Sequence, residues 1–208
     1  MLFYILIWLI IAIPGNNDLA LFKSLDATKL NGKLIVDFCT ARPSDKFEIS
    51  KIVDDSGGVY VDVAAMGSFP TLKQKVPMLL SGRGADNMLK EFDGLGMDMK
   101  IVGEKAGDAM IVKLCRSIYM KGLAALTIEM TKVCEAYGVK EQVWASLAKS
   151  MDHDQFMIYT PRLIDGTIRN LERRINEVCE CIDLIKSIEE TGVMTEATLK
   201  LYKSLRNN

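Results

Sequence analysis

"KLIVDFCTARPSDKFEISKIVDDSGGVYVDV", residues 33–63, predicts a strand, a helix and a second strand in immediate succession. "KLIVD" and "VYVDV" are short apolar runs that favour β structure. Pro43 suits the first turn of the intervening helix, and Gly57-Gly58 ends it. The apolar positions expected on that helix are Phe47, Ile49 and Ile52. This order predicts parallel strands joined by a right-handed crossover, which is the unit of an α/β layer.

The residues on either side extend the same layer. Upstream, "MLFYILIWLIIAIPG" begins with an apolar run that ends at Pro14. The run is shorter than the roughly 20 residues of a membrane span, and it has no basic start as a signal peptide would. It predicts a central strand covered on both faces, and a membrane anchor through residues 1–13 is the alternative. Downstream, "PMLLSG" (77–82) and "MKIVGE" (99–104) predict two more strands around a short helix.

The sequence changes character at Gly107, after which the only proline is Pro161. Apolar residues then recur every three to five positions, which indicates helices. The longest is expected over 108–137, with Gly138 ending it. Shorter helices are expected at 140–149, 152–162, 167–190 and 195–205, the last capped by Thr195. The sequence therefore predicts a partial α/β domain in residues 1–105 and an all-helical domain in residues 106–208.

Composition excludes several kinds of partner. The formal net charge is −1 and the basic residues are scattered, so electrostatics do not favour nucleic-acid binding. The number of cysteines is odd and their spacing matches no zinc pattern, which favours reduced thiols without a metal site. We expect a cytoplasmic protein with no nucleic-acid or membrane partner. The five cysteines are Cys39, Cys115, Cys134, Cys179 and Cys181.

The order of the motifs resembles the second half of a β-hydroxyacid dehydrogenase, a superfamily that includes 6-phosphogluconate and 3-hydroxyisobutyrate dehydrogenases. The matching strings are "IIAIPG", "GKLIVDFCTARP", "GGVYVDVAAMGS", "PMLLSG" and "GDAMIVKLCRS". The stretch "NLERRINEVCECIDLIKSIEETGVMTEAT" is similar to the helical domain of a phosphogluconate-dehydrogenase-like branch. The resemblance implies a partial Rossmann-type domain, a 6-phosphogluconate dehydrogenase C-terminal-like helical domain, and NAD or NADP as cofactor.

The resemblance assigns a catalytic role to Lys113. The string Gly107–Lys113 is similar to the family's G-x-G-x-x-x-K, with Ala109 in place of the second glycine. In that family a β-hydroxyacid gives a hydride to the cofactor, and the lysine takes the alcohol proton. A lysine can do so when burial lowers its pKa from about 10.4 toward roughly 7–8, and apolar neighbours suit that role. A surface lysine is the alternative, since lysines are mostly exposed.

Substrate residues follow from two further motifs. "DVAAMGS" resembles the family's substrate loop D-A-P-V-S-G-G, and Met66 stands where that loop has its serine. After the lysine, an arginine and a serine stand where the family has two asparagines, and a guanidinium can bind a carboxylate through two hydrogen bonds. A small anionic hydroxyacid is therefore the implied substrate. The implied contacts are Met66, Gly67, Ser68, Arg116 and Ser117.

Four further positions are implied with less direct motifs. The resemblance places Pro14 and Thr40 along the nicotinamide and Arg174 near the substrate, while Lys121, two helical turns beyond Lys113, is a candidate to bind the substrate anion. Lys121 and Arg174 have alternatives as members of ordinary ion pairs. Those alternative acidic partners are Glu129 or Asp152 for Lys121, and Glu172 or Glu177 for Arg174.

One expected motif is absent from the 208 residues. The dinucleotide fingerprint G-x-G-x-x-G does not occur, and "GRGADN" (82–87) lacks the third glycine. The resemblance also implies a homodimer through the helical domain. Two functions stay open: an NAD(P)-dependent oxidoreductase acting on a small β-hydroxyacid, or a non-catalytic helical dimerisation module.

Overall fold

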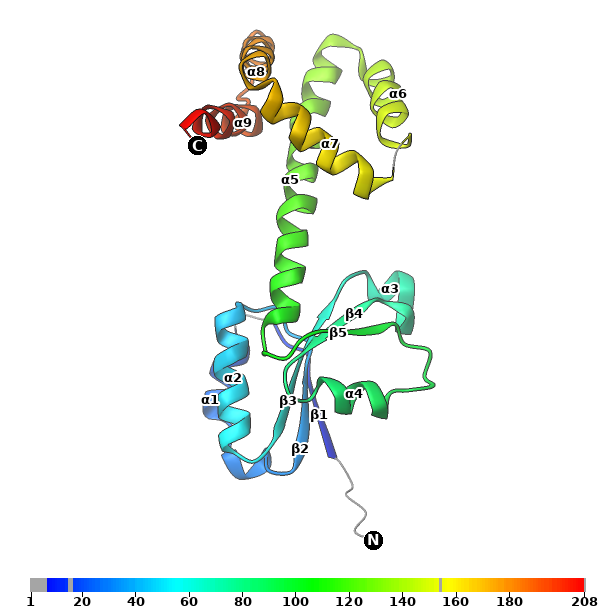
Figure 1. Cartoon of the computed structure of the whole chain (residues 1–208), viewed down its shortest axis with the longest axis vertical. Coiled ribbons are helices and arrows are strands. Elements are labelled where there is room, and N and C mark those ends of the chain that lie inside the picture. Colours follow the sequence, from blue (N-terminus) through cyan, green and yellow to red (C-terminus); the bar gives the residue numbers. More distant parts are fainter. Residues whose placement is uncertain (1–6, 15–16, 154, 208) are drawn as a thin grey trace. The chain divides into compact units, whose positions relative to one another are not determined.

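The computed structural model describes residues 7–14, 17–153 and 155–207. The chain divides into two compact units, residues 1–118 and residues 119–208, which are described in turn (Figure 1). The division falls inside one long helix, whereas the sequence changes character at the start of that helix.

The first unit contains a five-stranded sheet. Its strands are β1 (Ile7–Ile11), β2 (Lys33–Asp37), β3 (Val59–Ala65), β4 (Met78–Ser81) and β5 (Met99–Gly103), in that spatial order. Strands β1, β2 and β3 run parallel, as predicted, while β4 runs antiparallel to β3 and parallel to β5. The central position predicted for the first strand is wrong among the described residues. There β1 pairs only with β2, so it is an edge strand and the side chain of Ile10 is 55% exposed.

Helices cover both faces of this sheet. On one face lie α1 (Asp18–Ser24) and α2 (Pro43–Asp55), and on the other lies α4 (Ala85–Glu91) (Figure 1). Strand residues alternate between the two layers, because successive side chains in a strand point to opposite faces. Ile35 packs in the core beneath α1 and α2, and Leu34 and Val36 pack in the core beneath α4.

The buried face of α2 differs from the expected one. Lys46, Ile49 and Val53 are fully buried, whereas Phe47 is 47% exposed and Ile52 is partly buried. Residues three and four apart share one side of a helix, so Lys46 lies on the apolar side of α2. Of the three apolar positions predicted from the sequence, only Ile49 is fully buried, and the buried Lys46 was not predicted.

The long helix α5 (Asp108–Tyr137) has the predicted bounds. Gly138 follows it with φ of 65°, a left-handed conformation that glycine adopts without strain and that commonly ends helices. Before the helix, Gly107 has φ of 100°, and a Cβ there would lie 2.8 Å from the carbonyl oxygen of Pro43 in α2. The close neighbour that requires a glycine at this position is therefore the first turn of α2. A short helix α3 (Phe69–Leu72) follows β3.

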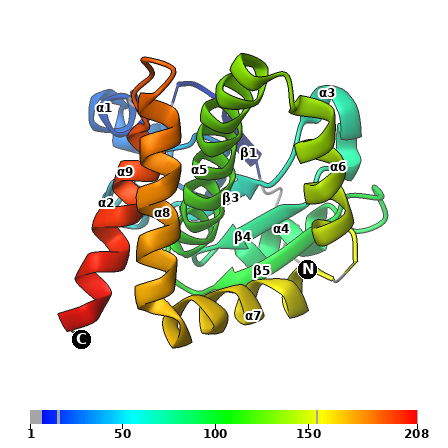
Figure 2. The same cartoon turned by 90° about the horizontal axis from the view of Figure 1, so that it is seen from above.

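The second unit is helical. After the end of α5 it contains α6 (Lys140–Met151), α7 (Phe156–Arg169), α8 (Leu171–Lys186) and α9 (Val193–Ser204), and α8 and α9 lie side by side (Figure 2). The bounds expected for the seventh and eighth helices are wrong, because the chain breaks at Asn170 rather than before Thr167. The predicted cap Thr195 is also wrong: Gly192 precedes α9, and Thr195 lies in its first turn.

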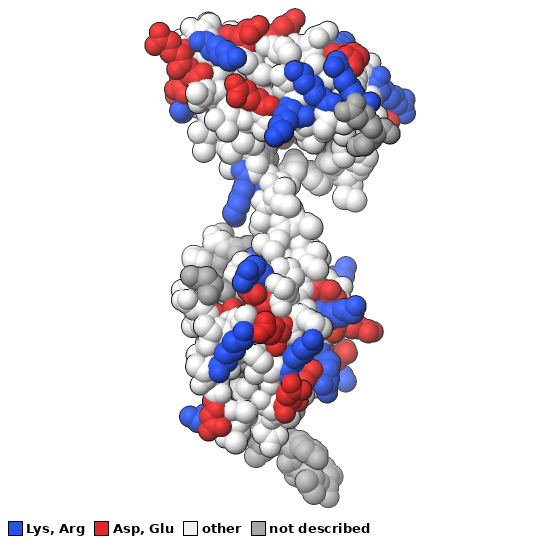
Figure 3. All heavy atoms as spheres, turned by 90° about the vertical axis from the view of Figure 1, so that its left-hand side faces the viewer, with Lys and Arg blue, Asp and Glu red and all other residues white. Residues whose placement is uncertain are grey.

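The surface charges are mixed, as expected from a net charge of −1. Figure 3 shows basic and acidic side chains intermixed over this face of both units. Among the described residues, the helices are all too short or too polar to cross a membrane. The alternative of an anchor through residues 1–13 rests partly on residues 1–6, which lie outside the described residues.

Candidate functional site

The centre of the candidate site is a contact between Lys113 and Thr40. Nζ of Lys113, in the second turn of α5, donates a 2.9 Å hydrogen bond to Oγ1 of Thr40, which follows β2. The two residues are 73 positions apart in sequence. The structure thus brings together the expected catalytic lysine and one of the two residues expected beside the nicotinamide.

The surroundings of Lys113 are more open than its sequence neighbours suggested. Its side chain is partly buried, while Ile111, Val112 and Leu114 are each at least 36% exposed. In this part of the helix, Ala109 and Met110 of the first turn are fully buried. Apolar neighbours in sequence therefore do not bury the amine in this chain, because a helix turns them onto other sides.

The expected substrate loop follows β3. The backbone N–H of Met66 donates to the carbonyl oxygen of Pro77 at 2.8 Å, and Gly67 and Ser68 are exposed. Ser68 immediately precedes α3, and its hydroxyl accepts a hydrogen bond from the Thr71 hydroxyl. Because β2 and β3 run parallel, Thr40 and the segment 66–68 follow the same edge of the sheet. That edge is where open α/β folds bind ligands.

The remaining expected residues lie at several places. Arg116 is exposed and Ser117 partly buried; at three and four residues from Lys113 they lie on the same side of α5. Pro14 is exposed, and its carbonyl oxygen accepts the backbone N–H of Asn17. The binding roles of these residues stay predictions.

Lys121 and Arg174 belong to the second unit. Lys121 is exposed, and Arg174 Nη1 lies 2.8 Å from Glu177 Oε2, which is one of the expected ion pairs. A role for either in substrate binding stays a prediction.

A buried charge cluster is hydrogen-bonded to the segments that precede Thr40 and Lys113, and sequence reasoning missed it. The ammonium of Lys46 is inaccessible to solvent and lies 2.7 Å from Asp37 Oδ2, 3.2 Å from Asp18 Oδ2 and 4.0 Å from Asp62 Oδ1. Burying an ammonium is costly unless charges and hydrogen bonds compensate it, and three carboxylates surround this one. We call this cluster, with the hydrogen-bonded Tyr60 and Ser81, the Lys46 network.

Asp37 is the most fully bonded carboxylate of the Lys46 network. Its Oδ2 accepts the Tyr60 hydroxyl at 2.6 Å in addition to the Lys46 ammonium. Its Oδ1 accepts the backbone N–H of Cys39 at 2.8 Å. The Tyr60 pKa is raised well above its ordinary value, first by desolvation and then by Asp37 and Asp62. Asp37 therefore fixes the backbone immediately before Thr40.

Asp62 joins the Lys46 network to the start of α5. Its Oδ2 accepts the Ser81 hydroxyl and the backbone N–H of Gly107, each at 3.2 Å. Ser81 Oγ in turn accepts the backbone N–H of Ala109 at 3.0 Å. Desolvation raises the pKa of Asp62 to about 6; Lys46 opposes this rise and Asp37 adds to it. Asp62 lies within β3, not at its end.

The strand register explains the alignment. Asp37 is paired with Asp62, and Asp62 is paired with Ser81, so the three side chains form a row across neighbouring strands. A signal was present in the sequence: each aspartate interrupts an apolar strand, and Lys46 precedes Ile49 by three residues. Recognising it required the register, which the sequence did not supply.

The same cluster offers donor atoms for a cation. Side-chain atoms of Asp18, Asp37 and Cys39 lie within 4.8 Å of one another. The Lys46 ammonium already pairs with both carboxylates, and burial raises the Cys39 pKa to about 11, which keeps the thiol protonated. The donor set therefore fits its ammonium better than a metal ion, because cysteine binds a metal as the thiolate.

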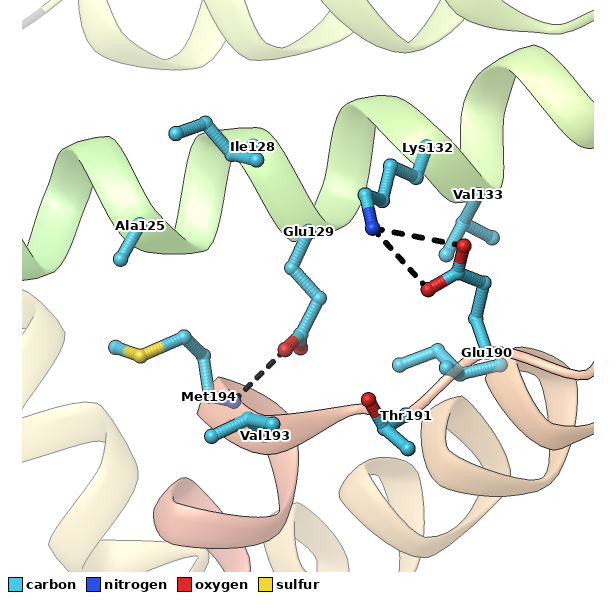
Figure 4. Close-up of a pocket in the computed structure, with 10 residues that line it drawn as sticks. Ala125, Ile128, Glu129, Lys132, Val133, Glu190, Thr191, Val193 and Met194 are labelled. Atoms are coloured by element: carbon cyan, nitrogen blue, oxygen red, sulfur yellow. Dashed lines mark hydrogen bonds and ion pairs between the residues drawn. The ribbon is translucent and has the colours of Figure 1, made fainter.

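The second unit has a cavity of about 340 Å³ between α5 and the residues before α9 (Figure 4). The charged side chains that line it are hydrogen-bonded or ion-paired with other groups of the second unit. The Glu129 carboxylate accepts the backbone N–H groups of Met194 and Thr195 at 2.7 and 3.0 Å, and Lys132 pairs with Glu190 at 3.2 Å. Glu129 thus caps α9 from another helix, which explains why Thr195 need not. It is therefore engaged here rather than with Lys121.

Comparisons with known proteins agree with this fold. Residues 135–205 match a family model described as a domain of unknown function, DUF1932. Over 199 residues the chain is 29% identical to an uncharacterized 28.5 kDa protein from Methanothermus fervidus, covering 91% of this chain and 76% of that protein.

Solved structures show the same likeness. A conserved hypothetical protein from Sinorhizobium meliloti is 25% identical with a TM-score of 0.56, covering 94% of this chain and 66% of its own. A conserved protein described as similar to 3-hydroxyacid dehydrogenases is 24% identical with a TM-score of 0.58, covering 95% and 74%. A reductive aminase from Aspergillus terreus, in complex with NADPH and ethyl-5-oxohexanoate, is 18% identical with a TM-score of 0.78, covering 96% and 74%.

These likenesses show the fold. The chain has the fold of a Rossmann-like part followed by a helical domain, which confirms the fold class predicted from the motifs. The chain spans just under two thirds of the Sinorhizobium structure and about three quarters of the others.

Proposed function

We propose that this chain supplies the proton-transfer lysine and the substrate loop of an NAD(P)-dependent oxidoreductase that acts on a small β-hydroxyacid. The hydrogen bond between Lys113 and Thr40 carries the proposal. The resemblance gave these residues different roles, one in proton transfer and one beside the nicotinamide. Their contact is what a shared reaction centre requires, because the alcohol proton and the hydride leave neighbouring atoms of one substrate.

The reaction needs three contributions from this chain. Lys113 accepts the alcohol proton as the carbinol becomes a carbonyl, and returns it in the reverse direction. Arg116 and Ser117, on the same side of α5, hold the substrate's anionic group, which a guanidinium can bind through two hydrogen bonds. The segment Met66–Ser68 lines the substrate at the end of β3. The nicotinamide cofactor, when bound, supplies the hydride acceptor.

The phosphate part of the cofactor is less well provided for. The 208 residues lack the glycine-rich fingerprint G-x-G-x-x-G, which holds the pyrophosphate of the cofactor in Rossmann folds. We therefore assign to this chain only the nicotinamide side of a cofactor site, at Pro14 and Thr40.

Turnover with a panel of small β-hydroxyacids and NAD⁺ or NADP⁺ tests the proposal. Lys113→Ala is expected to lower the rate about 10²–10⁴-fold, the usual contribution of general acid–base catalysis, with an unchanged melting temperature. Lys105→Ala, which removes an exposed lysine elsewhere in the first unit, is the matched control. A Lys113→Ala protein that keeps more than about a tenth of the rate contradicts the role.

Binding separates this function from the alternative. Saturable binding of NADPH by the purified chain, followed by nicotinamide fluorescence, supports the oxidoreductase. Absence of both binding and turnover favours a non-catalytic dimerisation module.

A second copy of the chain is the proposed partner. The helix α7 carries apolar side chains that the second unit leaves exposed; Met157 is 79% exposed. Exposed apolar clusters of this kind mark interfaces, and oligomers of identical chains most commonly have twofold symmetry. The others on α7 include Phe156, Ile158, Leu163, Ile164 and Ile168.

Mass measurement by light scattering tests the dimer. The wild-type chain is expected at twice its 23.2 kDa mass, and Ile164→Glu is expected to shift it toward the monomer. Leu95→Glu, which alters an exposed leucine of the first unit, is the control and is expected to leave the dimer intact. A monomeric wild-type protein contradicts the proposal.

A further inference from the structure

The Lys46 network includes neither Lys113 nor Thr40, but it is hydrogen-bonded to the backbone of the segment before each of them. On one side, Asp37 Oδ1 accepts the backbone N–H of Cys39, the residue before Thr40. On the other side, Asp62 Oδ2 accepts the backbone N–H of Gly107, the residue before α5. The segments that carry the two site residues are thus fixed to two carboxylates of one buried cluster.

The network also links those two carboxylates to each other. Lys46 Nζ lies 2.7 Å from Asp37 and 4.0 Å from Asp62, and the two aspartates are paired in register. All three side chains are inaccessible to solvent. Such a cluster has few alternative arrangements, because moving any member leaves a buried charge without its partners.

A second path reaches the same helix turn. Ser81 donates its hydroxyl proton to Asp62 and accepts the backbone N–H of Ala109. Two of the N–H groups at the start of α5, those of Gly107 and Ala109, therefore end on Asp62 or on its partner. The N–H groups in the first turn of a helix have no partner within the helix, so these bonds set where α5 begins.

We infer that Asp37, Lys46 and Asp62 are positioning residues, which hold the Thr40 segment and the start of α5 so that Lys113 meets Thr40. The inference rests on the proposed function only for the task given to Lys113. The geometric coupling itself can be measured without cofactor or substrate, so it can fail or succeed independently of turnover.

The rate of acetylation of individual lysines by acetic anhydride, read by mass spectrometry, measures that coupling. The hydrogen bond to Thr40 slows the reaction of Lys113 in the wild-type protein. Asp62→Ala removes the acceptor for Gly107 and is expected to raise the Lys113 rate about five-fold, since one hydrogen bond contributes about 1 kcal/mol. Exposed Lys29 is the internal reference.

Two controls separate positioning from unfolding. Lys46 is inaccessible in the folded protein, so its acetylation reports global opening, and it is expected to stay unlabelled. Asp62→Asn keeps an acceptor oxygen for Gly107 and is expected to restore the slow Lys113 rate. A folded Asp62→Ala protein with the wild-type Lys113 rate overturns the inference.

If Asp62→Ala exposes Lys46 as well, the milder Ser81→Ala decides. It removes the acceptor for Ala109 and keeps all three carboxylates and the ammonium. An accelerated Lys113 with a protected Lys46 supports the inference. An unchanged Lys113 rate in that variant overturns it.

Discussion

Lys46 Nζ lies 2.7 Å from Asp37 Oδ2, and neither side chain is accessible to solvent. The ion pair joins α2 to β2 in the first unit, and Asp37 also accepts the backbone N–H of Cys39, the residue before Thr40. Burying a charged group in an apolar core costs free energy. The surrounding hydrogen bonds and the ion pair itself must therefore compensate for the lost hydration of both groups.

Removing the Lys46 ammonium should strongly destabilise the fold. Lys46→Met leaves three buried carboxylates without their cation, and loss of one partner of a buried pair costs about 3–5 kcal/mol. We expect that decrease in the free energy of unfolding, measured by urea denaturation with circular dichroism. Lys51→Met, which changes an exposed lysine on the same helix, should stay within about 0.5 kcal/mol. Equal effects of the two substitutions would contradict the buried role of Lys46.

The raised pKa of Asp62 predicts an unusual pH dependence. The folded pKa of about 6 exceeds the ordinary 3.8, so between these values the folded state binds a proton that the unfolded state has lost. The stability from this group is therefore fully present below about pH 4 and is lost as pH rises through 6. The difference corresponds to about 3 kcal/mol. Lys46, Asp18, Asp37 and Tyr60 are the other titratable groups of the cluster.

Asp62→Asn isolates that dependence, because the other groups remain in both proteins. Relative to wild type, the variant should gain about 2–3 kcal/mol in unfolding free energy between pH 4 and pH 7.5. Urea denaturation at the two pH values measures it. Asp55→Asn, at an exposed position, should show no such difference. A variant whose stability parallels wild type at both pH values would argue against a raised pKa.

Two glycines of the α5 region should respond in opposite directions to alanine. At Gly107 the positive φ and the 2.8 Å approach of the Pro43 carbonyl oxygen both exclude a Cβ, so Gly107→Ala should lower stability by more than about 1 kcal/mol. At Gly122, within the helix, nothing lies within 4 Å of an added Cβ. Gly122→Ala should therefore raise stability by about 0.5–1 kcal/mol. Thermal denaturation of both proteins provides the comparison.

Glu129 should stabilise α9 locally. Its carboxylate accepts two backbone N–H groups and the Thr195 hydroxyl, so Glu129→Ala leaves the start of α9 without its cap. A loss of about 1–2 kcal/mol is typical for a helix cap. Faster hydrogen exchange should be confined to residues 193–204 in mass spectrometry. The control is Glu135→Ala, which changes another glutamate of α5, the exposed partner of Lys140. It should leave the hydrogen exchange of residues 193–204 unchanged.

The sequence by itself determined the periodic features. The bounds of α5, the glycine that ends it and the parallel start of the sheet follow from local spacing, because each depends on residues near one another in the chain. Motif order also predicted that Lys113 and Thr40 belong to one site, and the two residues, 73 positions apart in sequence, are hydrogen-bonded in the structure.

Tertiary structure alone decided which polar residues are buried together. In the sequence, Lys46 is one lysine of a charged helix, and Asp37 and Asp62 are single acids in separate strands. Only the strand register pairs the two aspartates, and only the packing of α2 on the sheet brings the ammonium between them. The physical reason is that burial of charge depends on long-range partners: whether a carboxylate is solvated or enclosed is settled by what folds over it, not by its neighbours along the chain.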